Sequence, residues 1–387
     1  MEYKKKIVHI SVSGAYTDGM SYQENYLTKY HVKLGYDVYL IASEWEYDNS
    51  GNYVKARSTD YINSYGVHVI RLKMRGRDDI SKHIRTYYGL ERTLEGISPD
   101  IIFHHGCQSL EEKTIINYCK YHQNVKLFVD NHSDFSNSAS SWISKNIQHK
   151  ILWKHYAQKI NPYVEKFYGV LPARVDFLIK MYGLPKEKID LLVMGADDEL
   201  VEVSNSASLK TELRDMYDVG VDDFLIVTGG KIDLYKKQVL LLMDAVNDIQ
   251  SRKFKLIVFG SVVDELKNEV KKRCSDKVKY IGWIPSMDSY KYFAASDIVV
   301  FPGRHSVFWE QAVGQGIPMI VKYWDGTTHV DCGGNVKFIR NDSIDEIKKL
   351  IESVERPEVY QTMKEVAIKN ASKFLYSHIA KQSIDMK

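Results

Sequence analysis

One stretch of the chain decides the fold: residues 296–321 read SDIVVFPGRHSVFWEQAVGQGIPMIV. The apolar run Ile298–Phe301 predicts a buried strand, and Pro302-Gly303 predicts a turn after it. A short helix carrying one acid, Glu310, comes next, and Gly316-Ile317-Pro318 leads into another apolar run. Doubly wound α/β sheets bind ligands just beyond the carboxyl ends of their strands. Glu310 therefore stands where a ligand-binding carboxylate is expected.

The composition indicates a soluble globular protein. Its 387 residues suffice for two domains with their own cores, and 44% are hydrophobic while 27% are charged. A formal net charge of +3 is too small to indicate nucleic-acid binding. The four cysteines contain no CxxC pair, so we expect neither a zinc site nor disulfides, and a cytoplasmic location. No apolar run reaches 18 residues and the N-terminal run is only a strand long, so we expect neither a membrane span nor a signal peptide.

The first half of the chain predicts a parallel sheet. The apolar run Ile7–Val12 is followed by a helix from about Ser21 to Leu34 and by a second strand at Asp37–Ala42. Such a strand–helix–strand unit joins parallel strands. Two further strands are expected at Ile101–Phe103 and Lys126–Val129.

The second half repeats this architecture. A new series of strands begins at Phe224–Val227, and we expect the polar region 199–222 before it to be a linker. The later strands are expected at Lys255–Phe259, Val278–Ile281, Ile298–Phe301 and Pro318–Val321. The predicted fold class is therefore α/β, with two Rossmann-like domains.

The loop after the strand Phe224–Val227 has the features of an anion site. Residues 228–237 read TGGKIDLYKK. Glycines allow a ligand to approach the backbone, and a helix start offers unpaired N–H groups. Lys231 and Lys236 add positive charge, so we expect phosphate to bind here. The alternative is a helix start with ordinary surface lysines.

Polar side chains also follow two strands of the first half. The sequence Asp130-Asn-His132-Ser-Asp134 comes directly after a buried strand. His132 is a candidate catalytic residue because acids flank it, and Asp134 would orient it or accept a proton from an acceptor hydroxyl. His104-His105 follows the preceding strand and is a less specific signal.

Together these motifs resemble the retaining family 4 (group 1-type) glycosyltransferases, which have the GT-B fold. Residues 310–321 are similar to the family's glutamate–alanine and glycine–x–proline signature, and residues 229–236 to its glycine–arginine–leucine–lysine motif. Gly282-Trp-Ile-Pro285 resembles its glycine–x–valine–proline loop. The resemblance spans nearly the whole chain and is most specific at residues 224–338.

This resemblance implies two Rossmann-like domains whose parallel sheets face each other across a cleft. An acceptor-side domain would comprise residues 1–200, and a helix at residues 372–387 would pack back on it. The nucleotide-sugar-binding domain would comprise residues 201–371.

The chain departs from the family in the loop before Glu310. The family's first motif glutamate is replaced by Pro302, and a shorter loop carries His305-Ser306-Val307 in its place. Lys231 stands where the family has arginine, which keeps the charge but loses bidentate geometry.

The resemblance also implies roles for individual residues. The catalytic residues would be His132 at the transferred sugar, Lys231 and Lys236 at the diphosphate, and Glu310 at the ribose. Tyr22 and Asp134 would lie on the acceptor side. The donor-binding residues would be Gly19, Gly230, Lys231, Lys236, Gly260, Ile284, Pro285, His305, Ser306, Val307 and Glu310.

The implied activity is transfer of a sugar from a nucleoside-diphosphate sugar, of UDP or GDP type, to a glycan or lipid-linked acceptor. The family transfers with retention of configuration and needs neither metal nor cofactor. Bacterial surface polysaccharide or glycoconjugate synthesis is the implied pathway. Basic stretches at residues 73–85 and 141–154 would contact the anionic inner membrane surface peripherally, or are simply solvated.

Two alternative functions remain open from the sequence. A sugar-nucleotide epimerase or hydrolase can share this fold and donor site, and the missing glutamate is compatible with a non-catalytic partner subunit. A dehydrogenase of the Rossmann type is disfavoured because neither glycine-containing loop supplies GxGxxG.

Overall fold

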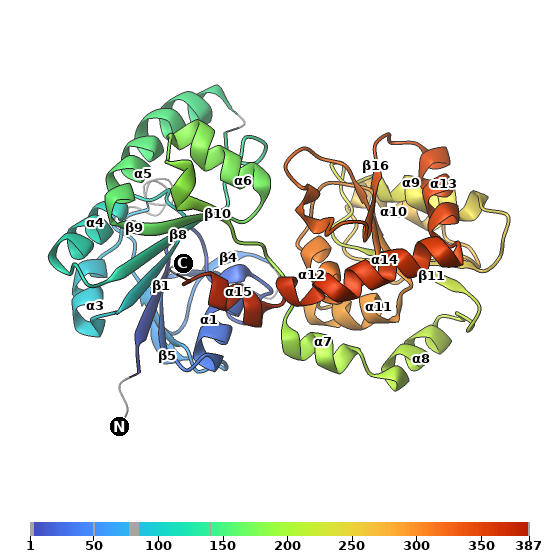
Figure 1. Ribbon diagram of the computed structural model, residues 1–387, viewed down its shortest axis with the longest axis horizontal. Helices are drawn as coiled ribbons and strands as arrows, with labels where there is room; N and C mark the ends of the chain where they lie inside the picture. Colours follow the sequence, from blue (N-terminus) through green and yellow to red (C-terminus); the bar gives the residue numbers. More distant parts are fainter. Residues whose placement is uncertain (1–3, 49–50, 77–84, 140, 386–387) are drawn as a thin grey trace. The chain divides into compact units, whose positions relative to one another are not determined.

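The computed structural model describes residues 4–48, 51–76, 85–139 and 141–385, and the chain divides into two compact units (Figure 1). The first unit runs to Val193 and includes the residues from Ile379 on, and the second is Met194–His378. Both are α/β units with parallel sheets, which confirms the predicted fold class. The division falls at Val193 rather than at residue 200.

The first unit is built on an eight-stranded sheet in the order β10-β9-β8-β7-β1-β2-β6-β5. Neighbouring strands are parallel except β5 and β6. The strands are β1 (Lys6–Ser11), β2 (Asp37–Ser43), β5 (Asp60–Ile62), β6 (His68–Leu72), β7 (Ile101–His105), β8 (Lys126–Asn131), β9 (Val164–Gly169) and β10 (Ile189–Leu191). A separate antiparallel pair joins β3 (Trp45–Tyr47) to β4 (Tyr53–Lys55).

Helices cover both faces of this sheet, which explains why its central strands are almost continuously apolar. The connection from β1 to β2, which contains α1, runs in one direction along the sheet. The connections from β6 to β7 and from β7 to β8, which contain α3 and α4, run in the other direction, so α1 lies on one face and α3 and α4 on the other (Figure 1). The helical segments are α1 (Gln23–Lys33), α3 (Leu90–Ile97), α4 (Glu112–Tyr121), η1 (Ser144–Trp153), α5 (Lys154–Ile160), η2 (Asn161–Tyr163), α6 (Pro172–Phe177), η3 (Leu178–Tyr182) and η4 (Lys186–Lys188).

The second unit has a six-stranded parallel sheet in the order β13-β12-β11-β14-β15-β16. Its strands are β11 (Phe224–Gly229), β12 (Phe254–Phe259), β13 (Val278–Tyr280), β14 (Ile298–Phe301), β15 (Met319–Lys322) and β16 (Val336–Ile339). Its helical segments are α7 (Asp198–Ser204), α8 (Ala207–Met216), α9 (Val239–Asp248), α10 (Asp264–Lys272), η5 (Ser286–Asp288), α11 (Ser289–Ala295), α12 (Phe308–Gly314), η6 (Thr328–Val330), α13 (Ile344–Val354), α14 (Pro357–Asn370) and η7 (Ala371–Phe374).

The linker predicted at residues 199–222 is wrong, because most of this region forms α7 and α8 of the second unit. The side chain of Asp197 caps α7 by accepting hydrogen bonds from the N–H groups of Glu199 (3.0 Å) and Leu200 (3.2 Å). Arg214 of α8 pairs with Asp297 at 3.2 Å, and Leu213 is buried. A capping acid before α7 and an ion pair from α8 therefore anchor these two helices.

The chain returns to the first unit within α15 (Tyr376–Gln382). Ile379 and Ala380 are fully buried. The hydroxyl of Tyr168 donates to the carbonyl oxygen of Gln382 at 2.9 Å, and the Gln382 amide donates to the carbonyl oxygen of Leu191 at 3.1 Å. The segment from Ile379 therefore completes the core of the first unit. None of the described helices combines the length and the apolar character needed to cross a membrane.

Candidate functional site

The predicted anion site of the second unit is a pocket at the carboxyl ends of β11 and β14. Gly230, Lys231 and Lys236 line it from the loop after β11, and Ser306 from the loop after β14. Arg304 lines the same pocket and was not singled out in the sequence. The structure thus brings both predicted lysines together with a third cation.

Two glycines bring the loops of this pocket into contact. Gly230 has φ +122° and Gly260, which follows β12, has φ +126°. A Cβ on Gly260 would lie 1.9 Å from the carbonyl oxygen of Gly230, far below any real contact. A side chain at Gly260 would therefore push the two loops apart. Gly260 shapes the pocket although it does not line it.

The three cations place positive charge around the pocket. Burial lowers the pKa of Lys236 and Asp233 opposes this, while Lys231 and Arg304 lower the pKa of Lys236 further. Lys231 is exposed and lies 3.8 Å from Asp233. Mutually repelling cations beside glycine loops are stabilised by a bound anion, so the arrangement suits a phosphate or diphosphate.

Glu310 lies in the first turn of α12 and is fully buried. Its Oε1 is 2.7 Å from Nε2 of His305 and 2.8 Å from Nε2 of His329 in η6. Burial alone would raise the pKa of Glu310, but the two histidines outweigh it and hold that pKa well below its usual range. Within the described part of the chain Oε2 of Glu310 has no hydrogen-bond partner.

Of the other predicted donor residues of this unit, only some line the pocket. Ser306 lines it, whereas Val307 is the exposed N-cap of α12. Ile284 is half-buried and Pro285 exposed, and neither belongs to the pocket lining. His329 was missed because no motif surrounds it in the sequence.

In the first unit, His132 follows β8 and its side chain is 41% exposed. Its Nε2 lies 3.4 Å from Oδ2 of the buried Asp130. Desolvation lowers the pKa of His132, but the Asp130 carboxylate outweighs it and raises that pKa above the ordinary value. Burial raises the pKa of Asp130, yet His132 and His105 together hold it far below its usual range.

The prediction that Asp134 orients His132 is wrong, because Asp130 makes that contact. Asp134 Oδ1 accepts hydrogen bonds from the N–H groups of Ser136 (2.7 Å) and Asn137 (2.9 Å), and Oδ2 lies 3.5 Å from Arg174. Asp134 therefore holds the turn after β8, as an acid at the start of a tight turn commonly does. Its role on the acceptor side stays a prediction.

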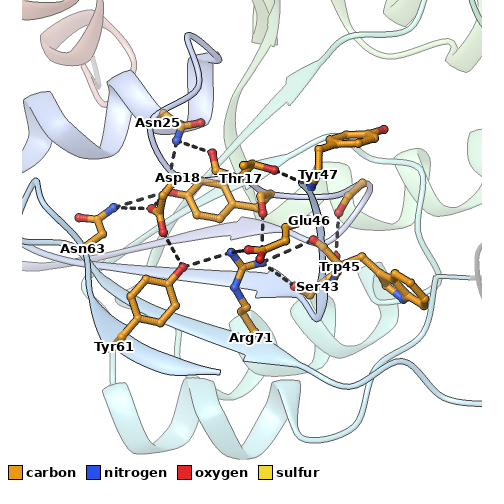
Figure 2. A network of polar contacts seen from close by, with 12 residues as sticks. Thr17, Asp18, Asn25, Ser43, Trp45, Glu46, Tyr47, Tyr61, Asn63 and Arg71 are labelled. Atoms are coloured by element: carbon orange, nitrogen blue, oxygen red, sulfur yellow. Dashed lines mark hydrogen bonds and ion pairs between the residues drawn. The ribbon is translucent and has the colours of Figure 1, made fainter. Parts of the chain in front are cut away.

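A polar network holds the loop after β1, which leads to α1 (Figure 2). Arg71 of β6 has a side chain only 1% exposed, donates to the carbonyl oxygen of Tyr16 at 3.0 Å and pairs with Glu46 at 2.9 Å. Asp18 accepts a hydrogen bond from the Tyr61 hydroxyl at 2.6 Å. The loop is therefore tied to β5 and β6, so its shape is set by the body of the sheet.

Two predicted residues lie in the last part of this loop. Gly19 has φ +75° with open space around it, and Tyr22 is the half-exposed N-cap of α1. Both are accessible at the carboxyl end of β1, as the prediction of ligand contact requires. Their ligands stay predictions.

Two groups of side chains could each hold a metal ion. His105, Asp130 and His132 form one group and His305, Glu310 and His329 the other, with ligand atoms within 4.8 Å of one another. Two imidazoles and a carboxylate are a donor set that zinc and iron accept. In each group the carboxylate already contacts both histidines, at 2.8 and 3.4 Å for Asp130 and at 2.7 and 2.8 Å for Glu310. That the protein works without a metal, as expected from the sequence, stays a prediction.

Comparison with known proteins relates this chain to glycosyltransferases. Residues 223–353 match the sequence profile of the family "Glycosyl transferases group 1". The mannosylfructose-phosphate synthase of Agrobacterium fabrum is 25% identical over 171 residues, which is 40% of this chain and 37% of that protein. The alignment with this curated relative thus spans little more than a third of its length.

Solved structures extend the likeness to the whole chain. The Anabaena protein HepE in complex with UDP has a TM-score of 0.67 at 16% identity, covering 98% of both chains. The UDP-GlcNAc 2-epimerase of Neisseria meningitidis bound to UDP-GlcNAc has a TM-score of 0.64 at 12% identity, covering 99% of both.

The chain therefore has the GT-B fold. Its second unit carries a domain of the group 1 glycosyltransferase family, which confirms the resemblance drawn from the motifs.

Proposed function

We propose that this protein transfers a sugar from a nucleoside-diphosphate sugar of UDP or GDP type to a glycan or lipid-linked acceptor. The observation that carries the proposal is the glycine-lined pocket with Lys231, Lys236 and Arg304 in the family-matched domain. We further propose that transfer proceeds with retention, requires no metal, and serves surface polysaccharide or glycoconjugate synthesis.

In this proposal the pocket stabilises the leaving nucleoside diphosphate. Charge develops on the bridging phosphate oxygen as the glycosidic bond breaks, and cations already in place stabilise that charge without reorganising. Lys236 is the best placed of the three because it is half-buried, where screening by water is weaker. Gly230 lines the pocket without a side chain, and Gly260 allows the two loops to approach each other closely.

Glu310 would hold the donor ribose through its remaining oxygen. Oε1 is already engaged by two histidines, whereas the buried Oε2 lacks a partner within the described chain. A buried acceptor without a donor is unfavourable, and a ribose hydroxyl would satisfy it. Glu310 is fully buried, whereas the side chain of His305, which contacts it, is partly exposed. His305 would therefore move aside to admit the ribose.

The first unit would supply the acceptor side and His132. His132 would contact the transferred sugar, with Asp130 holding its ring. The segment at η1 supports the proposed peripheral contact with the cytoplasmic face of a membrane, because Trp142 and Ile151 are 71% and 65% exposed among several lysines. The other basic stretch, residues 73–85, lies largely outside the described residues.

The first experiment is a thermal-shift panel of UDP, GDP, ADP, CMP and their sugars, each with and without EDTA. A ligand present at a hundred times its Kd stabilises by about 2.7 kcal/mol, which gives a clear melting shift. We expect one nucleotide to act selectively, without metal, and Lys236→Ala to abolish its effect. A shift with none of them would contradict the proposal and favour a non-catalytic partner subunit.

A sugar-nucleotide epimerase or hydrolase is the second candidate. The buried Asp130 with His132 at the end of β8 is the kind of acid–base pair that such chemistry needs. Incubating the stabilising sugar nucleotide without acceptor, and following its anomeric and ring protons by NMR, separates the two functions. Epimerised sugar, or release of free sugar as fast as transfer, would favour this candidate.

A further inference from the structure

Three buried histidines of the first unit form a continuous hydrogen-bonded row. Nδ1 of His31 in α1 lies 2.9 Å from Nε2 of His9 in β1. Nδ1 of His9 lies 2.9 Å from Nε2 of His105 in β7, and Nδ1 of His105 lies 2.8 Å from Oδ2 of Asp130. The row therefore ends at the carboxylate that contacts His132.

The other end of the row meets the C-terminal segment. Nε2 of His31 lies 3.0 Å from the carbonyl oxygen of Ala380 and 3.1 Å from the hydroxyl of Ser383. A carbonyl oxygen only accepts hydrogen bonds, whereas a hydroxyl can also donate one. The hydroxyl of Ser383 also lies 2.9 Å from the carbonyl oxygen of Ala380, so its single proton goes either to that oxygen or to Nε2 of His31.

The contacts allow two arrangements of protons. If Ser383 donates to His31, all three rings can be neutral with their proton on Nδ1, and every contact has one donor and one acceptor. If His31 instead donates to Ala380, the row needs one proton more than three neutral rings carry, so one ring is an imidazolium. In both arrangements Nδ1 of His105 carries a proton and donates to the ionised Asp130.

Asp130 is thereby fixed by two donors on different elements. Its Oδ1 accepts a hydrogen bond from the N–H of Gly106 at 2.9 Å, and its Oδ2 from His105. Because a carboxylate only accepts, the contact from Asp130 to His132 requires a proton on Nε2 of His132. Nδ1 of His132 is then the ring nitrogen that can meet a ligand.

We propose that His31, His9 and His105, together with Ser383, are positioning residues that fix the tautomer and orientation of His132 through Asp130. His132 presents its Nδ1 to the transferred sugar, and the row keeps the ring from turning over. Its effect on catalysis rests on the proposed glycosyl transfer, whereas the arrangement of protons does not depend on any activity.

The proton arrangement is tested by NMR of the full chain with ¹⁵N-labelled histidine. Ring nitrogens with and without a proton resonate far apart, and His105→Gln and His132→Gln assign the two critical rings. We expect a proton on Nδ1 of His105 and on Nε2 of His132 in both arrangements. In the arrangement with Ser383 as donor, His31 carries its proton on Nδ1, and Ser383→Ala moves that proton to Nε2. A bare Nδ1 on His105, or a stoichiometric metal ion found by elemental analysis, would overturn the proposal, since a metal there replaces that proton.

The effect on catalysis is tested at His9, which touches no substrate. His9→Leu breaks the row, whereas His9→Gln keeps one donor and one acceptor. We expect His9→Leu to lower kcat at least about tenfold with KM for the donor unchanged, and His9→Gln to recover most of the loss.

The matched control is His104→Gln, because His104 is as buried in β7 but contacts Glu112 at 3.2 Å instead of the row. Equal losses in His9→Leu and His104→Gln, or no recovery in His9→Gln, would refute the positioning role. If His9→Leu does not fold, the wild-type spectrum decides, because a bare Nδ1 on His105 contradicts both arrangements of the row. A wild-type protein without turnover would count against the proposed function alone.

Discussion

The contact between the loops of the pocket makes Gly260→Ala an informative substitution. A Cβ at Gly260 would lie 1.9 Å from the carbonyl oxygen of Gly230, whereas real contacts of this kind essentially never fall below 3.0 Å. The residue also has φ +126°, where a side chain is strained by about 1–3 kcal/mol. Forcing the loops apart adds about 1–3 kcal/mol, as overpacking does. We expect Gly260→Ala to destabilise the second unit by about 4 kcal/mol.

Gly230→Ala separates the two contributions. Gly230 has nearly the same φ, +122°, but the nearest atom to its Cβ position would be 4.0 Å away, so only the backbone strain applies. We expect about 2 kcal/mol there, and at about 2–4 °C for each kcal/mol the melting temperatures differ by several degrees. Thermal unfolding gives the totals, and hydrogen exchange of peptides covering β11 and β12 assigns the loss to these loops. Equal destabilisation by the two substitutions would refute the reasoning, because the overlap would then have no energetic consequence.

Three further predictions concern charged groups. Lys236→Ala should raise the Kd for the stabilising nucleoside diphosphate about 10- to 100-fold in calorimetry, since a charge-assisted hydrogen bond contributes about 1.5–3 kcal/mol. Lys237 is an exposed neighbour, and Lys237→Ala should change this Kd less than about twofold. Equal effects of the two substitutions would contradict the assignment of Lys236 to the pocket. Arg71→Met should lower the free energy of unfolding of the first unit by about 3–5 kcal/mol in urea, because it leaves the buried carbonyl oxygen of Tyr16 and the half-buried carboxylate of Glu46 without their donor. Lys126→Met, which breaks the exposed ion pair with Glu165, should cost under about 1 kcal/mol, and a similarly small loss for Arg71→Met would argue against the network. Glu310→Gln should destabilise the second unit by about 2 kcal/mol at pH 6, since two hydrogen bonds lose a charged acceptor. The folded protein depresses the pKa of Glu310, so its stabilisation is present above the unfolded-state pKa of about 4.3 and is lost as pH falls toward the folded pKa. The difference from wild type should therefore be smaller at pH 3.5 than at pH 6, and a difference that grows toward acid would disprove this account.

Much of the fold was predictable because the central strands are buried on both faces. Runs such as Ile298–Phe301 have no polar position, and a parallel sheet covered by helices leaves that signature in sequence. The short strand β5 was missed because none of its three residues is buried, and β16 because only the first and last of its four residues are buried. The polar helix α8 was predicted to be a linker because Leu213 is its one buried residue.

The candidate site was predictable where a motif fixes both residue type and spacing. Lys231 and Lys236 follow a glycine pair after a strand, and the structure places them at one pocket. Contacts between distant segments were not predictable. His329 contacts Glu310 from 19 residues away. Asp130 rather than Asp134 contacts His132 because Asp130 lies in β8, whereas Asp134 lies in the turn beyond it and faces Arg174.

The return of the chain to the first unit has a consequence for how the protein is made. Ile379, Ala380 and Ser383 are fully buried in a unit whose other residues end at Val193. On the ribosome the strands β1 to β10 emerge long before these residues, so His31 and the hydroxyl of Tyr168 await their partners while the whole second unit is synthesised. The unit that begins the chain can therefore finish folding only after the unit that follows it has been translated.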